Sequence, residues 1–220
     1  SPDRTISGEP VSGWSVAVEP GMTSLLAPDG ATTPVTLTVT PPTDAISGTA
    51  GLITVTVTSS FDGVTADRAT ATTTVRQVRG LELISDQQQE VDSTISTVTY
   101  LHTLTNTGNA TESITLDVLS SLGWNTDLAP ASPVILGPWA STPVTLQLTL
   151  PPGSGGLVDT TVITAQISGT SITDTVQDVT DVGVGYAVEI APLLQSQDAA
   201  PEEVVTFTHT VTNIGNVDDT

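Results

Sequence analysis

The chain contains two copies of one ten-residue segment. YLHTLTNTGN occupies residues 100–109, FTHTVTNIGN occupies residues 207–216, and six of the ten positions are identical. Self-similarity at a fixed period is the sequence signature of a repeat architecture. Only four residues follow the second copy, so the sequence predicts a repeat that starts but is not finished.

Four further matches extend the repeat at nearly the same spacing. They pair SGW (12–14) with LGW (122–124), TPVTLTVTPP (33–42) with TPVTLQLTLPP (142–152), LITVTVTSS (52–60) with VITAQISGT (162–170), and GLEL (80–83) with AVEI (187–190). One unit of about 107–110 residues has the size of an immunoglobulin-type sandwich. We predict that residues 1–79 hold the later strands of a unit that is incomplete at its N-terminus. Residues 80–186 then form a complete unit, and residues 187–220 hold the first two strands of a further one.

Apolar residues alternate with threonine along most of these segments. Val35, Leu37 and Val39 alternate with threonines, and such a period of two in β-branched residues predicts half-buried strands. Clusters of proline and glycine separate the segments, which favours an all-β fold of tandem immunoglobulin-like antiparallel sandwiches. The predicted strands of the complete unit are 80–85, 96–106, 111–120, 141–150, 160–168 and 173–182.

The period also predicts which side chains face the core of the complete unit. Along residues 143–150 we expect Leu146 to point inward and Gln147 outward, with Thr145 and Thr149 on the outward side. The predicted inward set is Val98, Tyr100, Leu104, Val144, Leu146, Leu148, Ile163, Ala165 and Ile167.

Charge and composition exclude several classes of partner. The chain has 24 acidic and 4 basic residues and a formal charge of −20. Such a surface repels nucleic acid and anionic lipid, and the apolar runs are too short for direct insertion into a membrane. There is no cysteine for a disulfide or thiolate metal site. There is also no lysine, which excludes the Lys–Asn isopeptide bonds that lock some pilus sandwiches.

The motifs resemble a known family. The order is a strand ending in T-N-x-G-N (Asn106-Thr107-Gly108-Asn109), then Gly123-Trp124, then the Pro-bounded strand from Pro143 to Pro152. It is similar to the Thr-rich Ig-fold repeats of large bacterial and archaeal surface proteins, and to Ig-like modules attached to some secreted glycosidases. The resemblance implies an extracellular spacer, stalk or accessory module and carries no active site.

No residue pattern predicts catalysis, a cofactor or a metal. His102 and His209 are equivalent in the repeat and lie on the apolar face of their segments, where a hydrogen-bonded histidine in the core or at its rim is the expected structure. One histidine per unit without cysteine falls short of a zinc site. The T-N-x-G-N segment is expected to be a turn in which asparagine and glycine tolerate positive φ. Asp218 and Asp219 follow one copy, but the other copy lacks a comparable set of Ca²⁺ ligands.

Three side chains are candidates for contacts or modification. Trp14 and Trp124 are expected to cap the core or an interface. Trp139 has no counterpart in the first unit; structural packing is the favoured role for it, and an exposed contact for sugar is the alternative. Asn109-Ala110-Thr111 fits the N-x-T pattern, which makes Asn109 a candidate glycosylation site.

The sequence thus predicts a non-enzymatic extracellular or cell-surface structural protein, the unit of a head-to-tail filament or stalk. Its partners would be neighbouring copies of itself, with the stripe Val205, Phe207, His209 and Val211 forming strand contacts that complete residues 1–79 of a neighbour. These contacts would occur between separate chains or along one longer repetitive chain. The alternative is a carbohydrate-binding or adhesive accessory module of a secreted protein, with cell-surface glycans as partners.

Overall fold

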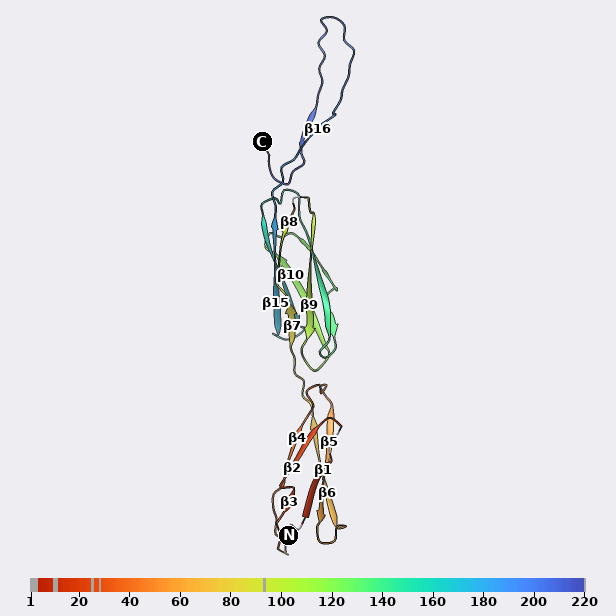
Figure 1. Cartoon of the computed structure of the whole chain (residues 1–220), viewed down its shortest axis with the longest axis vertical. Helices are drawn as coiled ribbons and strands as arrows, with labels where there is room; N and C mark the ends of the chain where they lie inside the picture. The colour runs from red at the N-terminus through yellow and green to blue at the C-terminus, as the bar shows by residue number, and fades with distance from the viewer. Residues whose placement is uncertain (1–3, 10–11, 25, 28, 93, 220) are drawn as a thin grey trace. The chain divides into compact units, whose positions relative to one another are not determined.

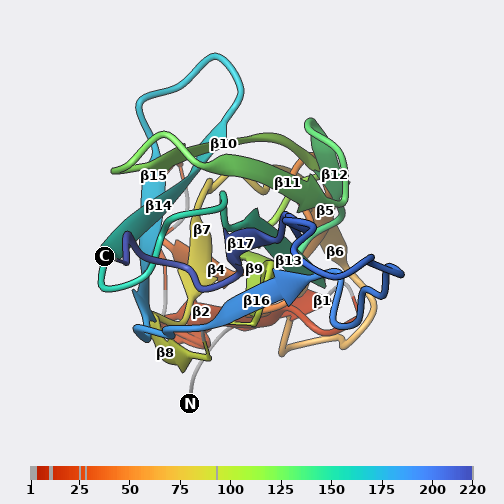
Figure 2. The ribbon, with the colours of Figure 1, turned by 90° about the horizontal axis from the view of Figure 1, so that it is seen from above.

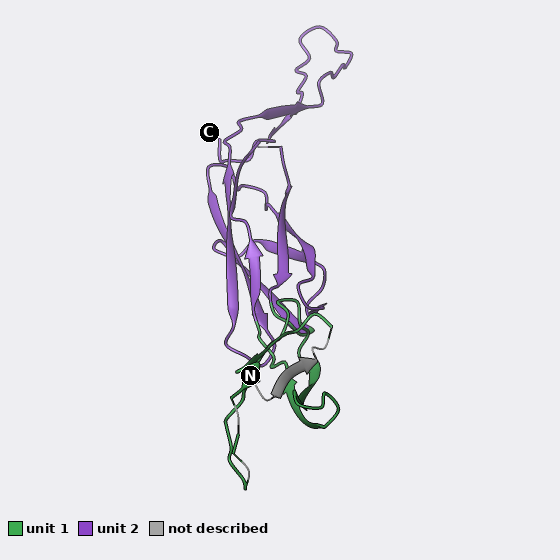
Figure 3. Cartoon of the chain, turned by 60° about the horizontal axis from the view of Figure 1, so that its bottom comes forward, with its two compact units in different colours: residues 1–79, 108–111 green, residues 80–107, 112–220 purple. Residues whose placement is uncertain are grey.

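A computed structural model describes residues 4–9, 12–24, 26–27, 29–92 and 94–219. These residues divide into two compact units (Figure 3): unit 1 comprises Ser1–Arg79 with Gly108–Thr111, and unit 2 comprises Gly80–Thr107 with Glu112–Thr220. The described residues form strands and turns without a helix, and they contain no helical segment that could cross a membrane.

Unit 2 contains a sandwich of two sheets. Its strands, of which Figure 1 labels β7, β8, β9, β10 and β15, alternate between the two sheets from β7 to β14, and β14 is followed by β15 in the same sheet. One sheet has the order β12-β10-β14-β15-β8 and the other β11-β13-β9-β7. This is the predicted all-β, immunoglobulin-like architecture. The strands are β7 (Leu81–Ile84), β8 (Gln87–Val91), β9 (Thr97–Asn106), β10 (Glu112–Ser120), β11 (Asn125–Ala129), β12 (Val134–Leu136), β13 (Ser141–Thr149), β14 (Val158–Ile167) and β15 (Thr173–Val182).

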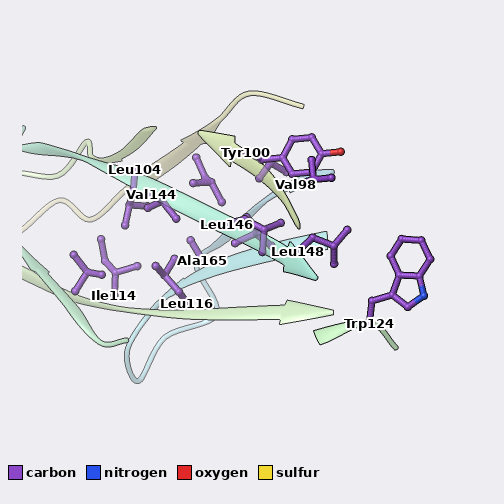
Figure 4. Packing of buried hydrophobic residues seen from close by; sticks show 14 of the residues in the cluster. Val98, Tyr100, Leu104, Ile114, Leu116, Trp124, Val144, Leu146, Leu148 and Ala165 are labelled. Atoms are coloured by element: carbon purple, nitrogen blue, oxygen red, sulfur yellow. The ribbon is translucent and has the colours of Figure 1, made fainter. Parts of the chain in front are cut away.

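The period-two prediction holds along the inner strands. Each of the six segments predicted for this region contains a strand, and every residue of the predicted inward set is buried. Leu146 is fully buried while Gln147, the next residue of β13, is exposed, so the predicted register is confirmed. Figure 4 shows how Leu146, Leu148, Ala165 and Tyr100 converge between the sheets. Burying each large aliphatic side chain contributes about 1.5–3 kcal/mol.

The sequence does not predict strand β8, because QQQEV lacks apolar alternation. It pairs parallel with β15, with Gln87 opposite Asp178 and Val91 opposite Val182. Its glutamine side chains also complete the edge of β9 beyond the end of β7. Gln89 Nε2 donates to Thr99 O at 3.0 Å and Gln87 Nε2 donates to Leu101 O. Side-chain amides therefore take the place of a strand along this part of β9.

Unit 1 repeats the later part of the same sandwich. Its sheets have the orders β3-β1-β5-β6 and β2-β4. Along the chain these strands follow the pattern of β10 to β15, since β1 pairs with β5 as β10 pairs with β14, and β2 pairs with β4 as β11 pairs with β13. The strands are β1 (Arg4–Glu9), β2 (Ser15–Glu19), β3 (Met22–Thr23), β4 (Thr36–Thr40), β5 (Ala50–Ser59) and β6 (Ala66–Thr74).

A small core holds the sheets of unit 1 together. Trp14 and Ile53 are its buried hydrophobic side chains among the described residues. Gly51 lies directly beneath the indole, because a Cβ on it would be 3.1 Å from Trp14 Cε3. Trp14 therefore packs on the core as predicted, and so does its counterpart Trp124.

Candidate functional site

The strongest candidate site is a pair of strands at the end of unit 2. The strands β16 (Val188–Ala191) and β17 (Thr210–Asn213) form a two-stranded sheet of their own (Figure 2). Their pairing reproduces that of β7 and β9. Val188 lies opposite Asn213 as Leu81 lies opposite Asn106, and the remaining pairs correspond in the same order. We call residues 187–220, which contain this pair, the tail.

Two side-chain contacts repeat as well. His209 Nδ1 is 2.7 Å from Pro192 O, and its equivalent His102 Nδ1 is 3.0 Å from Ser85 O. Gln195 Nε2 donates to Thr208 O at 2.6 Å, in the manner of the glutamines of β8 on β9. The tail thus has the local conformation of the first strands of a sandwich.

The difference between the two copies lies in what covers them. In unit 2 the stripe Tyr100 and Leu104 is fully buried. The equivalent residues in the tail are open, with Phe207 44% and Val211 69% exposed. Of the four residues predicted to make strand contacts, Val205 is half-buried and Phe207, His209 and Val211 are exposed. The tail therefore presents an apolar face that its counterpart buries completely.

Unit 1 has the complementary feature. In unit 2, β9 and β7 follow β13 at one end of a sheet, and β8 follows β15 at the end of the other. Among the described residues, unit 1 has no strand in the equivalent places beside β4 and β6. The inward residues Leu37 and Val39 of β4 are only half-buried, whereas their equivalents Leu146 and Leu148 are fully buried.

His102 is buried as predicted, and the structure adds a partner that the sequence did not indicate. Its Nε2 is 2.9 Å from Asp178 Oδ2 on β15, and both side chains are inaccessible to solvent. Nearby, Tyr100 OH is 2.7 Å from Thr180 Oγ1, and burial raises the pKa of this phenol. Both contacts join the two sheets.

A second buried carboxylate closes the bend after β10. Asp159 Oδ1 accepts hydrogen bonds from Ser120 Oγ at 2.7 Å, Ser121 Oγ at 3.0 Å and Leu122 N at 2.9 Å, and Oδ2 accepts from Thr161 Oγ1 at 2.6 Å. Burial alone would raise the pKa of Asp159, but these donors outweigh it and hold the pKa below its usual value. The network fixes a turn, and all four of these donors belong to the protein itself.

The remaining acidic residues are dispersed. A shallow depression is lined by Glu90, Asp92 and Asp181 beside Val91 and Gly183. Within the described part of the chain, no group of three or more His, Asp or Glu side chains is arranged to hold a metal ion. Asp218 and Asp219 are exposed.

The other predicted candidates lie in turns. Trp139 stands between β12 and β13, 44% exposed, with a positive φ of 54°. Asn109 lies in the turn between β9 and β10, as predicted for T-N-x-G-N, but its side chain is only 9% exposed. Its Nδ2 donates to Arg76 O at 3.0 Å and its Oδ1 accepts from Val78 N at 2.8 Å. Glycosylation at Asn109 stays a prediction, and a glycan on Nδ2 would disturb these hydrogen bonds.

Comparison with known proteins gives weak matches. No protein-family model matches the chain, and no curated protein sequence matches it. Human CDH23 EC21-23 is 13% identical with a TM-score of 0.46, over 98% of this chain and 70% of that one. Domains 4 and 5 of the S-layer protein SbsC are 14% identical with a TM-score of 0.33, over 78% of this chain and 71% of that one. An endo-fucoidan hydrolase from glycoside hydrolase family 107 is 13% identical with a TM-score of 0.28, over 82% and 24%. Similarity at this level assigns no function.

Proposed function

We propose that the chain is a non-enzymatic structural protein, a stretch of immunoglobulin-like units in a head-to-tail filament or stalk outside the cell or on its surface. In this array the tail supplies the first two strands of a sandwich whose later strands have the form of residues 1–79. The observation that carries the proposal is the pairing of β16 with β17 in the register of β7 with β9.

The tail and the β4 edge of unit 1 present complementary surfaces. An open strand edge and an exposed apolar face are both costly in water, and both invite pairing with another chain. The tail offers an apolar stripe, and β4 offers a free edge with half-buried Leu37 and Val39. Adding a strand to such an edge satisfies backbone hydrogen bonds and covers the stripe at the same time.

The contact is heterologous, because the tail and β4 are different surfaces of the repeat. Such contacts propagate as an open filament when the rotation between successive copies does not close into a ring, and the filament is the arrangement proposed. Two arrangements satisfy the proposal: pairing between separate chains, or consecutive units of one longer repetitive polypeptide. The charge of −20 supports a soluble surface that avoids nucleic acid and anionic lipid.

Introduced cysteines give a clean test, since the chain has none of its own. In unit 2, Thr145 lies opposite Leu101. The equivalent residues are Thr36 on β4 and Thr208 in the tail, and both are exposed. Under mild oxidation the double variant Thr36→Cys/Thr208→Cys should form a ladder of disulfide-linked oligomers on a non-reducing gel.

Two matched variants make this test specific. Thr36→Cys/Thr212→Cys lies four residues out of register and should not form the ladder. Leu101→Cys/Thr145→Cys should form a disulfide within one chain, which shows that the position tolerates the bond. Equal cross-linking of the in-register and out-of-register pairs, or of neither, would contradict the proposal.

Trp139 supports a second candidate function, carbohydrate binding by an accessory or adhesive module. The indole is 44% exposed at a turn, and aromatic rings that face solvent supply large amphipathic contact surfaces. Binding to cell-surface glycans should then be detectable on a glycan array and disappear in Trp139→Ala. Retention of binding in that variant, or no binding by the unmodified chain, would speak against this function.

A further inference from the structure

The last asparagine of T-N-x-G-N holds residues far from its own turn. Asn216 Nδ2 donates to Gly183 O at 2.8 Å, and its Oδ1 accepts from Gly185 N at 2.8 Å. Its backbone N donates to Gly185 O, and its O accepts from Gly155 N, both at 3.0 Å. One residue thus binds the connection between β15 and β16 and the loop between β13 and β14.

The same four hydrogen bonds occur at the other copy, within unit 1. Asn109 Nδ2 donates to Arg76 O at 3.0 Å and Oδ1 accepts from Val78 N at 2.8 Å. Asn109 N donates to Val78 O at 3.0 Å, and Asn109 O accepts from Ser47 N at 2.9 Å. The three partner residues of Asn109 occupy the same places in the repeat as the three partner residues of Asn216. Two sequence copies with different surroundings therefore make one set of contacts.

The first asparagine of the motif acts differently. Asn213 Nδ2 donates to Val217 O and its Oδ1 accepts from Gly215 N, both at 2.8 Å. These bonds stay inside the turn, as the sequence predicted for this motif. The equivalent Asn106 binds Leu136 O and Gly137 O at 3.0 and 2.8 Å, inside the sandwich. In both copies the last asparagine binds the connection that precedes its own repeat.

The glycines around Asn216 are needed for a reason other than the positive φ expected from the sequence. Gly215 does not have a positive φ, so left-handed backbone does not explain it. Instead, a Cβ at Gly215 would lie 2.5 Å from Gly185 O and 3.0 Å from Ala187 N. A Cβ at Gly155 would lie 2.6 Å from Asn216 Cγ and 2.7 Å from Val217 Cγ1. Gly215 thus lets backbone approach backbone, and Gly155 leaves room for the side chains of Asn216 and Val217.

We propose that the last asparagine of T-N-x-G-N is a clamp at the joint between successive repeats. Its binding partner is the connection and the adjacent loop of the preceding repeat. A short irregular connection is otherwise free to change direction, and its backbone groups need partners. The clamp supplies partners to three of these groups, Gly183 O, Gly185 N and Gly185 O, and to Gly155 N of the adjacent loop, and thereby holds the connection in one conformation. This inference builds on the proposed array, to which it adds a connection held by hydrogen bonds at every repeat.

The test measures amide hydrogen exchange by NMR in the full chain at a concentration where it is monomeric. In Asn216→Ala the Gly185 amide should exchange about tenfold faster, because its acceptor is gone. The Val78 amide should keep its rate in the same variant. Asn109→Ala should give the reverse result, with fast exchange at Val78 and no change at Gly185.

Asn213→Ala is the matched control, since it removes an asparagine of the same motif whose bonds are local. It should leave Gly185 unchanged and speed exchange at Gly215 only moderately, because Gly215 N also donates to Ala187 O at 3.1 Å. Protection of the Leu146 amide shows in each variant that the sandwich remains folded. Should Asn216→Ala lose that protection, Gly155→Ala is the second variant, which leaves the asparagine but crowds it and should also expose Gly185.

The clamp is overturned if Gly185 keeps its exchange rate in both Asn216→Ala and Gly155→Ala, or if Asn213→Ala accelerates it as much as Asn216→Ala does. The exchange experiment concerns single chains, whereas the cysteine experiment concerns contacts between copies. Failure of one is therefore distinguishable from failure of the other.

Discussion

His102 Nε2 lies 2.9 Å from Asp178 Oδ2, and neither side chain is accessible to solvent. The pair joins β9 of one sheet to β15 of the other. His102 is held from its other side by Ser85 O at 3.0 Å. Asp178 Oδ1, in contrast, is buried without a hydrogen-bond partner among the described residues. The carboxylate therefore depends on the histidine for most of its compensation.

Removing the histidine should be strongly destabilising. In His102→Leu the Asp178 carboxylate stays buried without its partner, and the free energy of unfolding should fall by about 3–5 kcal/mol. Urea denaturation followed by circular dichroism measures the change. Asp127→Asn alters an exposed carboxylate of β11 and should stay within about 0.5 kcal/mol of the parent. Similar effects of the two variants would show that the buried pair has no special role.

Neighbouring residues of β13 should differ sharply in their tolerance of truncation. Leu146→Ala leaves a cavity between the sheets and should cost about 2–5 kcal/mol of stability. Gln147→Ala changes an exposed side chain and should change stability by no more than about 0.5 kcal/mol. Thermal and chemical unfolding of both variants compare the two faces directly. A larger loss for Gln147→Ala would contradict the register.

Asp159 should make unit 2 sensitive to acid. Burial opposes its ionisation, but the donors Thr161, Ser120, Ser121 and Leu122 N hold its pKa below the ordinary value of 3.8. A carboxyl whose pKa is lowered by folding contributes stability above the unfolded pKa and loses it as the pH falls through the folded value. Stability should therefore drop below about pH 4, the ordinary range for Asp.

The variant Asp159→Asn isolates this contribution. It should be less stable than the parent at pH 7, and its stability should fall less steeply between pH 4 and pH 2. Unfolding curves across this range provide the measurement. Asp62 differs from Asp159 in being exposed. Hydrogen bonds from Thr65 nevertheless lower the pKa of Asp62 to about 2. If Asp159→Asn retains the full acid sensitivity of the parent, another carboxylate is responsible.

The inner strands were predictable because apolar residues alternate along the sequence with a period of two, which is also the period at which side chains of a strand face the core. Leu146 and Gln147 lie on opposite faces for that reason alone. The strand β8 was not predictable, since its glutamines carry no apolar alternation and it is held by side-chain bonds to β9 and parallel pairing with β15. Parallel pairing joins residues that are distant in sequence, and no local pattern reports it.

The sequence also did not predict the roles of single polar residues. Position on an apolar face predicted that His102 is buried, but nothing near it in the sequence indicated Asp178, which lies 76 residues away. The two asparagines of T-N-x-G-N look alike as turn residues. Their separate roles depend on which backbone groups lie within reach after folding.

In a completed sandwich the tail would meet the β6 strand of a unit like unit 1. Gly48 N donates to Val75 O as Gly156 N donates to Val182 O, so Val75 corresponds to Val182. Four residues earlier, half-buried Ala71 then corresponds to Asp178. If the tail completes a unit like unit 1, His209 faces Ala71 and has no carboxylate. Ala71→Asp should restore the pair, which is worth about 1.5–3 kcal/mol for a hydrogen bond to a charged group.

A double-mutant cycle on self-association of the full chain, measured by sedimentation velocity, separates this gain from other effects of the new charge. His209→Gln alone should change association little, whereas it should weaken association strongly in the Ala71→Asp background. Thr72→Asp is the control, because it adds the same charge on the exposed side of β6 and should show no coupling to His209. Additive effects of Ala71→Asp and His209→Gln would mean that the tail does not occupy the place that β9 holds in unit 2.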